Sequence, residues 1–164
     1  MSSKSDYTDA EWQRLERAPI VAGMAISLSD PGGPIEALKE SKATVKTILE
    51  AGSTGSFGPL AQEVAQGVIT QITAEHKTPM GDFKPKGALA GAEILDELRA
   101  VGALLTEKAT AEEAEGFRGF IVEAAQRAAN AAKEGGFMGF HAERVSQGEA
   151  DMLVKVGEAV GASA

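Results

Sequence analysis

Apolar side chains recur every three or four residues along most of the chain. A clear case is the run Ile94, Leu95, Leu98, Val101 and Leu105. This spacing places side chains on one face of an α-helix. The sequence lacks the sustained alternation of apolar and polar residues that a strand would show. The pattern therefore predicts an all-α protein.

The segment after Pro34 has one apolar stripe. Its members follow helical spacing and are Ile35, Leu38, Val45, Ile48 and Leu49. Such a stripe is typical of a helix that packs one face on a hydrophobic core, and the lysines of the segment lie mostly off it. Gly52 is expected to end this helix, because glycine takes the left-handed conformation of a C-cap without strain.

Three capping boxes predict where helices begin. In each, a hydroxyl residue accepts from the amide of a glutamate three positions later, and the glutamate carboxylate accepts from the hydroxyl residue's own amide. The pairs are Thr8 with Glu11, Thr110 with Glu113, and Ser146 with Glu149. Pro34 and Pro59 are expected at the first positions of two further helices, where a missing N–H leaves no bond unmade.

Pro19 lies inside the first apolar pattern. Proline removes a backbone donor and its ring clashes with the preceding turn, so it kinks or ends a helix. We therefore expect a break at Ala18 and Pro19, followed by a second helical stretch that reaches about Ser29.

The organisation of the chain is that of one helical domain over residues 1–164, with about six or seven helices in a single bundle. A chain of this length buries a sizeable core. Residues 1–7 are expected to form a flexible arm, and residues 161–164 a frayed tail. Residues 76–87 contain two prolines and two glycines and are expected to form a long internal connection.

Charge and composition narrow the classes of function. The formal net charge of −8 at pH 7 argues against nucleic acid and membrane surfaces as partners, since both are bound through basic patches. The absence of cysteine excludes disulfides, zinc thiolate sites and thiol catalysis. The apolar runs are too short to span a bilayer and no signal peptide is visible, so we expect a cytoplasmic protein. Aromatic residues make up only 5% of the chain, so the core must consist of aliphatic residues and alanine.

Histidine and carboxylate spacing gives little support for a metal site. His76 and His141 are the only histidines, and neither follows a glutamate by three residues, as a di-iron bundle requires. The nearest candidate ligands for a metal are Glu75, His76 and Asp82. No nucleophile motif or acid–base constellation is present. We therefore name no catalytic residue, expect no cofactor, and give an enzyme the least support.

The segment 135–149 joins the last two predicted helices and concentrates unusual residues. Phe137, Met138, Phe140 and His141 follow two glycines, and a solvated loop does not usually carry two phenylalanines and a methionine. We expect these side chains to cover the end of the bundle as a plug. The alternative is that they form a docking surface or the lid of a cavity.

Several motifs resemble those of a group of small, uncharacterised bacterial all-helical proteins. They are EWxxLxxAP at residues 11–19, DPGGP at residues 30–34, and KEGGFMGF followed by RVSxxE at residues 133–149. In that group the last segment resembles KEGGFLGFGG followed by VSxxE, and this sequence has His141 and Ala142 where the group tends to have glycines. The group has no assigned activity, so the resemblance implies a helical fold and no particular chemistry.

Two functions remain open. The first is a structural or protein-interaction module that self-associates as a homodimer, through the alanine and glycine faces of the helices predicted at residues 88–108 and 111–133. The second is the binding of a small apolar molecule inside the bundle, because alanine-rich bundles can leave cavities between their helices.

Overall fold

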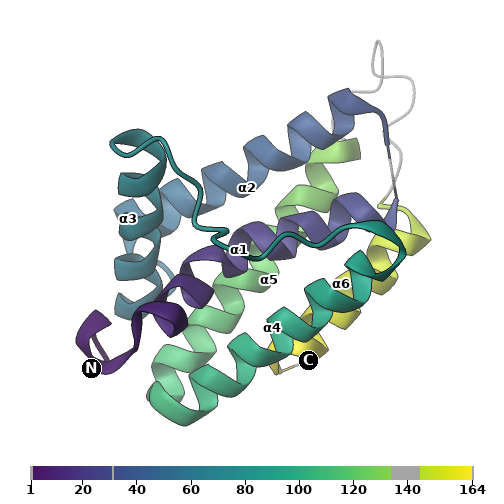
Figure 1. The fold of residues 1–164 in the computed structure, drawn as a ribbon. Helices are drawn as coiled ribbons and strands as arrows, with labels where there is room; N and C mark the ends of the chain where they lie inside the picture. The colour runs from purple at the N-terminus through teal and green to yellow at the C-terminus, as the bar shows by residue number, and fades with distance from the viewer. Residues whose placement is uncertain (1, 31, 134–144, 164) are drawn as a thin grey trace.

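The computed structural model describes residues 2–30, 32–133 and 145–163 of the chain, and these residues contain six α-helices and no strand (Figure 1). The prediction of an all-α, single-domain helical bundle is confirmed. No helix in the described residues is long and apolar enough to cross a membrane. The helices are α1 (Asp9–Ser29), α2 (Pro34–Thr54), α3 (Pro59–Thr73), α4 (Ala90–Lys108), α5 (Ala111–Lys133) and α6 (Gln147–Val160), with 3-10 turns at Lys4–Asp6 and Gly87–Leu89.

Helices α1 and α5 form the centre of the bundle. Each packs against all the other α-helices, and the two also pack against one another (Figure 1). The inner face of α5 carries Phe117, Phe120 and Ile121 near its start and small residues further along, and all of them are buried. The small residues that continue this face are Ala124, Ala125, Ala128 and Ala129. The core is therefore aromatic at one end and narrow at the other.

The predicted capping boxes all form. The amides of Glu11 and Glu149 donate to the hydroxyls of Thr8 and Ser146, and α5 begins with the same reciprocal bonds between Thr110 and Glu113. Pro34 and Pro59 open α2 and α3 as predicted. Helix α2, however, continues past Gly52 to Thr54, and Gly55 supplies the left-handed cap at φ 65°.

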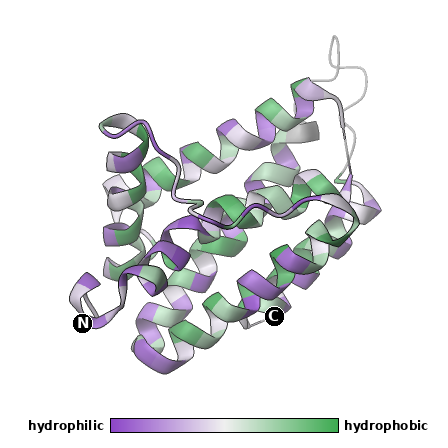
Figure 2. Cartoon of the chain, viewed as in Figure 1, coloured by the Kyte–Doolittle hydropathy of each residue, from purple (hydrophilic) through white to green (hydrophobic). Residues whose placement is uncertain are grey.

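The apolar stripe of α2 does not face the core, contrary to the prediction. Ile48 is buried, but Ile35, Leu38 and Leu49 are 69%, 55% and 47% exposed, and Val45 is 38% exposed. Figure 2 shows apolar residues along α2, at the outer edge of the bundle. The buried face of α2 consists instead of mostly small or polar residues, namely Glu40, Thr44, Thr47, Ile48, Ala51 and Gly52. Small residues are selected there because α2 packs closely on α5.

Helix α1 runs from Asp9 to Ser29 without a break, so the expected interruption at Pro19 is wrong. An interior proline loses one hydrogen bond and typically costs a helix about 3 kcal/mol. The turns on both sides of Pro19 are buried in the core, including Leu15 before it and Val21 after it. Burial of these apolar side chains outweighs the missing hydrogen bond.

Residues 2–7 do not extend from the bundle as the expected flexible arm. Tyr7 is buried, and its ring centre lies 5.6 Å from that of Trp12. The Lys108 ammonium lies over the Tyr7 ring and pairs with Glu11 at 2.7 Å. The arm is held against the bundle because these apolar rings are removed from water together.

The expected frayed tail begins with a helix cap. Gly161 has a φ of 74°, and the N–H groups of Gly161 and Ala162 donate to the carbonyls of Glu158 and Gly157. These two bonds form the Schellman motif, which satisfies the last carbonyls of a helix. The first two residues of the tail are therefore bonded to α6 rather than frayed.

The long connection predicted at residues 76–87 lies between α3 and α4 and spans residues 74–89. It runs along α1 (Figure 1), where the Phe83 ring lies 5.4 Å from the Arg17 guanidinium. Pro79 is buried, and Met80 and Phe83 pack against the core. The connection therefore covers part of α1.

We predict opposite effects for two glycine-to-alanine changes in helices. A Cβ at Gly116 would overlap the carbonyl oxygen of Phe57, whereas a Cβ at Gly157 would meet nothing within 4 Å. Gly116→Ala should therefore destabilise the protein by about 1–3 kcal/mol through overpacking. Gly157→Ala should stabilise it by about 0.5–1 kcal/mol, because alanine loses less backbone entropy in a helix. Urea titrations of both variants measure these changes, and a neutral Gly116→Ala would contradict the packing described here.

Candidate functional site

Five glutamate side chains are buried in the described part of this small, acidic protein. They are Glu16, Glu40, Glu97, Glu113 and Glu149. A carboxylate is costly to remove from water unless hydrogen bonds or opposite charges compensate it. The partners of each glutamate therefore show whether it holds the fold together or lines a site.

Glu16 joins α1 to α3. The Trp12 indole donates to one carboxylate oxygen at 3.1 Å, and the Gln71 amide donates to the other at 2.7 Å. A Cβ at Gly67 would lie 2.7 Å from the first oxygen, so α3 leaves space for this carboxylate. Both oxygens of Glu16 have fixed donors, and we assign it a structural role.

Glu97 holds α4 to α1 through two arginines. Its Oε1 atom lies 3.0 Å from Arg14 Nε and 2.7 Å from Arg17 Nη2. Both arginines line a surface hollow of about 390 Å³ together with Asp82 and Phe83. Carboxylates already pair with or lie beside these guanidinium groups, which weakens the hollow as a site for an anion.

Glu113 and Glu149 belong to helix caps. Glu149 bonds the Ser146 amide at 2.9 Å, while Glu113 bonds Thr110 and also the amide and hydroxyl of Ser2, at 2.7 and 2.6 Å. Burial alone would raise the pKa of Glu113, but the hydrogen bonds from Ser2 and Thr110 outweigh it and lower the pKa to about 2. Neither carboxylate faces a cavity described here.

Glu40 lies in the wall of a mostly apolar groove between α1 and α2. Its side chain is 3% exposed, and its carboxylate accepts a hydrogen bond from the Ser27 hydroxyl of α1. The groove has a volume of about 310 Å³ and is half open to solvent. Its lining consists of Ile20, Gly23, Met24 and Ser27 of α1, Glu40, Ser41, Thr44 and Val45 of α2, Ile72 of α3, and Thr78 of the connection.

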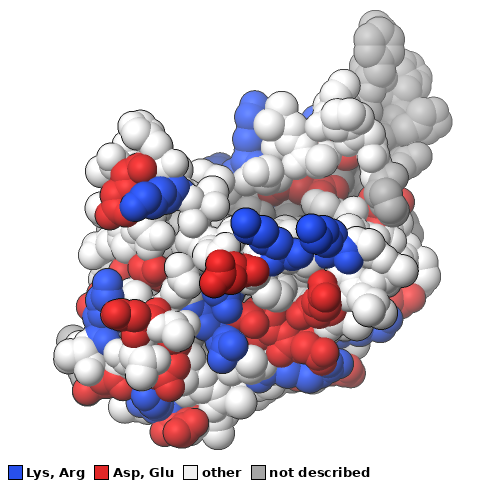
Figure 3. All heavy atoms as spheres, in the orientation of Figure 1, with Lys and Arg blue, Asp and Glu red and all other residues white. Residues whose placement is uncertain are grey.

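Small side chains create this groove. A Cβ at Gly23 would overlap the Thr44 hydroxyl, so α1 and α2 approach closely at this point. Thr44 donates to the Glu40 carbonyl of its own helix at 3.1 Å, which leaves its hydroxyl satisfied without a larger partner. Beside this contact, a space of about 310 Å³ remains among the described residues of α1, α2, α3 and the connection. Figure 3 shows a recess there, with acidic atoms visible inside it.

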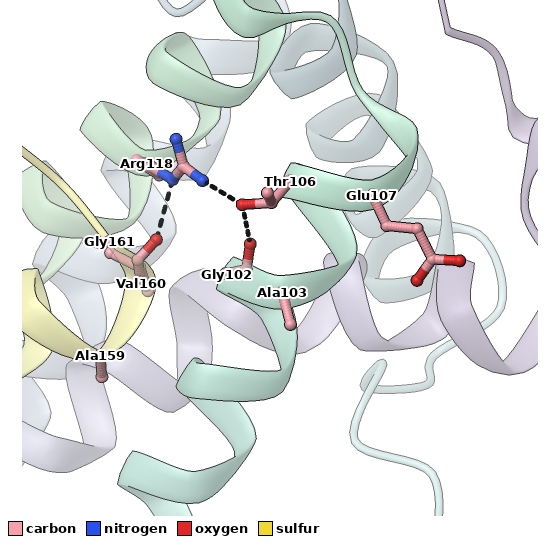
Figure 4. Close-up of a pocket in the computed structure, with 8 residues that line it drawn as sticks. All are labelled: Gly102, Ala103, Thr106, Glu107, Arg118, Ala159, Val160 and Gly161. Carbon is pink, nitrogen blue, oxygen red and sulfur yellow. Dashed lines mark hydrogen bonds between the residues drawn. The ribbon is translucent and has the colours of Figure 1, made fainter.

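A second hollow, of about 350 Å³, surrounds Arg118 at the end of α6 (Figure 4). Arg118 Nε donates to the Val160 carbonyl at 2.9 Å, and its Nη2 donates to the Thr106 hydroxyl at 2.8 Å. Thr106 in turn donates to the Gly102 carbonyl at 3.0 Å. The guanidinium stabilises the negative C-terminal end of α6. The hollow is shallow and both Arg118 and Thr106 are held by hydrogen bonds within the fold, so the α1–α2 groove is the stronger candidate site.

The weak metal candidates Glu75, His76 and Asp82 lie in the connection and are all exposed. Within the part of the chain that the structure describes, no three histidine or acidic side chains lie close enough to hold a metal ion. Glu75 lies 3.8 Å from the ammonium of Lys77. His76 has a φ of 54°, in the left-handed region, where histidine is enriched. The backbone conformation therefore accounts for a histidine at this position without a metal.

The predicted plug or lid residues Phe137, Met138, Phe140 and His141 lie outside the described residues. The helix faces that were predicted for self-association lie in the described residues, and neither suits an interface. Most of the alanine face of α5 is buried inside the protomer, so it is not available for a second copy. The outer face of α4 carries the exposed charged residues Glu93, Asp96 and Arg99, which makes it a poor interface core.

The α1–α2 groove was missed in the sequence, although one local signal was present. Glu40, Thr44, Thr47 and Ala51 follow helical spacing on the side of α2 opposite the lysines. A face of small residues with one carboxylate is typical of close helix packing around a polar group. The stripe of large apolar residues on the other side of α2 is the stronger pattern, so the sequence predicted that side, rather than the face of small residues, to be buried.

We predict that Glu113 stabilises the protein only above acidic pH. Its folded pKa of about 2 lies below the ordinary value of 4.5, so its contribution is complete above pH 4.5 and is lost as the pH falls toward 2. Glu113→Gln should therefore destabilise the protein at neutral pH, by at most about 3 kcal/mol, and much less near about pH 3. Urea titrations at both pH values measure the difference. Glu112→Gln, an exposed change in the same turn, is the control, and an equal loss for Glu113→Gln at both pH values would contradict the prediction.

Comparison of the chain with protein-family models found no match, and comparisons with curated proteins and with solved structures found none either. The resemblance to a group of bacterial helical proteins stays a prediction. The features of the molecule that bear on its function are the groove between α1 and α2 and the exposed face of α2.

Proposed function

We propose that this protein binds a small apolar ligand in the groove between α1 and α2. The observation that carries the proposal is the combination of a half-enclosed volume of about 310 Å³ with a lining of Ile20, Met24, Val45 and Ile72. Binding sites for small molecules are typically concave, mainly apolar, and supplied with a few polar groups that orient the ligand. Here the hydroxyl residues and Glu40 supply those polar groups.

The position of the groove also supports a ligand of modest size. Its volume lies at the lower end of the range that ligand pockets occupy, roughly 300–1,000 Å³. Four separate elements contribute lining residues, and two of them, α1 and α2, are fixed by their packing on α5. The site is therefore formed before a ligand arrives, which lowers the entropy lost on binding.

We predict that a large side chain at Val45 abolishes ligand binding. Val45 lies at the edge of the groove and is partly exposed, so an indole at this position can turn into the groove without entering the core. Titration calorimetry with n-octanol should detect binding to the parent protein and a loss of about tenfold or more in affinity for Val45→Trp.

Val154→Trp is the matched control for this experiment. Val154 is a valine on α6 that is 60% exposed and does not line the groove. Its replacement should leave the affinity for n-octanol unchanged. Equal affinities for the parent and for Val45→Trp would show that the alcohol binds elsewhere, and no binding by the folded parent would count against the proposed function.

Self-association is the second candidate function, and the exposed face of α2 favours it. Ile35, Leu38, Val45 and Leu49 recur at steps of three, seven and four residues, the spacing of a coiled-coil seam. Large apolar side chains that line up on the surface of a helix commonly mark an interaction site. This surface replaces the faces of α4 and α5 in the original prediction of a homodimer.

We predict that Leu38→Glu weakens self-association through this face. The change places a charge in the middle of the apolar stripe, where pairing would bury it. Sedimentation at high micromolar concentration should show a dimer for the parent and a monomer for Leu38→Glu, while Val154→Glu stays dimeric. Lys42 lies within the stripe, so pairing through α2 would bring the Lys42 residues of two copies near one another. Self-association should therefore strengthen as added salt screens the repulsion between them. A monomeric parent, or a dimer that Leu38→Glu does not disturb, would contradict an interface on α2.

A further inference from the structure

The exposed stripe of α2 has a lysine at its centre. Ile35 and Leu49 each lie seven residues from Lys42. Leu38 lies four residues before it, and Val45 lies three residues after it. At a rise of 1.5 Å per residue the stripe is about 21 Å long, with apolar residues on both sides of one charge. A surface that is nearly the same in both directions from its centre suits the two-fold pairing of identical helices.

The charge of Lys42 has no partner in the described part of the chain. Its side chain is exposed and forms none of the salt bridges found there. Lys46, one turn further along α2, differs because Glu50 lies nearby. After the hydrogen bond and charge of Arg127, the charge of Lys46 also helps to lower the pKa of Glu50. Lys42 would therefore enter an interface on the stripe as an uncompensated cation.

Pairing along this stripe brings two Lys42 ammonium groups near one another whichever way the helices run. In a parallel pair each residue lies beside its own copy, and in an antiparallel pair centred on the stripe the central residue does. Such pairing takes ammonium groups out of water and places like charges together, and both effects oppose association. The stripe spans only about two heptads, so little apolar area is available to offset that cost.

We propose that Lys42 is a modification site, at which acetylation of the side-chain nitrogen strengthens self-association through α2. The proposal rests on self-association, the second candidate function, and names its regulation. With an acetyl thioester as donor, the uncharged amine attacks the carbonyl carbon, the amide bond forms as the C–S bond breaks, and a thiol and one proton are released from the lysine and donor together. Acetylation removes the positive charge, so the repulsion between copies disappears and the cost of burial falls.

Exposure of Lys42 makes it accessible to a donor while the copies are apart. Incubation of the dilute, unaltered protein with acetyl-coenzyme A, followed by mass spectrometry of its peptides, should find Lys42 among the acetylated lysines. An unmodified Lys42 in a protein whose other exposed lysines are acetylated would overturn the assignment of this site.

Insertion of Nε-acetyl-lysine in place of Lys42 in the full chain tests the effect on association. Sedimentation at low salt should give a dimer dissociation constant about tenfold or more below that of the parent. Acetyl-lysine in place of Lys155, an exposed residue of α6, removes the same charge away from the stripe and should leave the constant within about twofold of the parent. No change at Lys42, or an equal change at both positions, would overturn the proposal and leave self-association standing. Monomers for the parent and both acetylated proteins would overturn self-association itself.

Salt and a conservative variant separate the charge from the added acetyl group. Lys42→Arg keeps the charge and should associate as weakly as the parent, whereas Lys42→Gln should associate more tightly. At about 1 M salt, where the screening length is about 3 Å, the parent should approach the acetylated protein in affinity. A difference that persists undiminished at high salt would show that the acetyl group acts through its apolar surface, and would overturn control by charge.

Discussion

Close approach of helix backbones at small residues is the constraint on which this structure depends. A Cβ at Gly102 would lie 2.8 Å from the Val160 carbonyl oxygen, and a Cβ at Gly52 would lie 2.8 Å from the Ile69 side chain. At Gly116 it would overlap the Phe57 carbonyl. With few aromatic residues to fill wide gaps, the helices must pack closely to exclude water, and small residues at the contacts permit that distance.

This constraint explains why the apolar stripe of α2 faces outward. The face of α5 that meets its neighbours there carries Ala124, Ala125 and Ala128, and large side chains opposite these residues would hold the helices apart. Helix α2 therefore presents Thr44 and Thr47. The Thr47 hydroxyl donates to the carbonyl of Ala43 in its own helix at 2.9 Å, so its burial leaves no polar group unsatisfied. Size, rather than hydrophobicity, decides which face of α2 is buried.

The features that the sequence predicted correctly are those decided within one turn of the chain. The caps at Thr8, Thr110 and Ser146 form between residues three positions apart, so their partners are visible in the sequence. The continuity of α1 through Pro19 and the outward face of α2 depend on neighbours that are remote in sequence. Helix propensity and periodicity contain no information about those neighbours.

The candidate site could not be predicted for the same reason. Its lining residues come from α1, α2, α3 and the connection, and the Ser27–Glu40 hydrogen bond joins residues whose pairing depends on how α1 crosses α2. The sequence instead drew attention to Phe137 and Phe140, which lie outside the described residues, and their role stays a prediction. Local sequence patterns predict the helices, whereas the groove arises from the packing between helices, which those patterns do not contain.

The two proposed functions share one edge, because Val45 both lines the groove and belongs to the exposed stripe of α2. A molecule in the groove would therefore contact a residue that a second helix packed on the stripe would also contact. If both proposals hold, ligand binding and self-association through α2 are thermodynamically linked: whatever factor the ligand applies to the pairing constant, pairing applies to the ligand's affinity. Close packing of α2 at small residues thus leaves both the groove beside Gly23 and Thr44 and the exposed stripe on the other side of the helix.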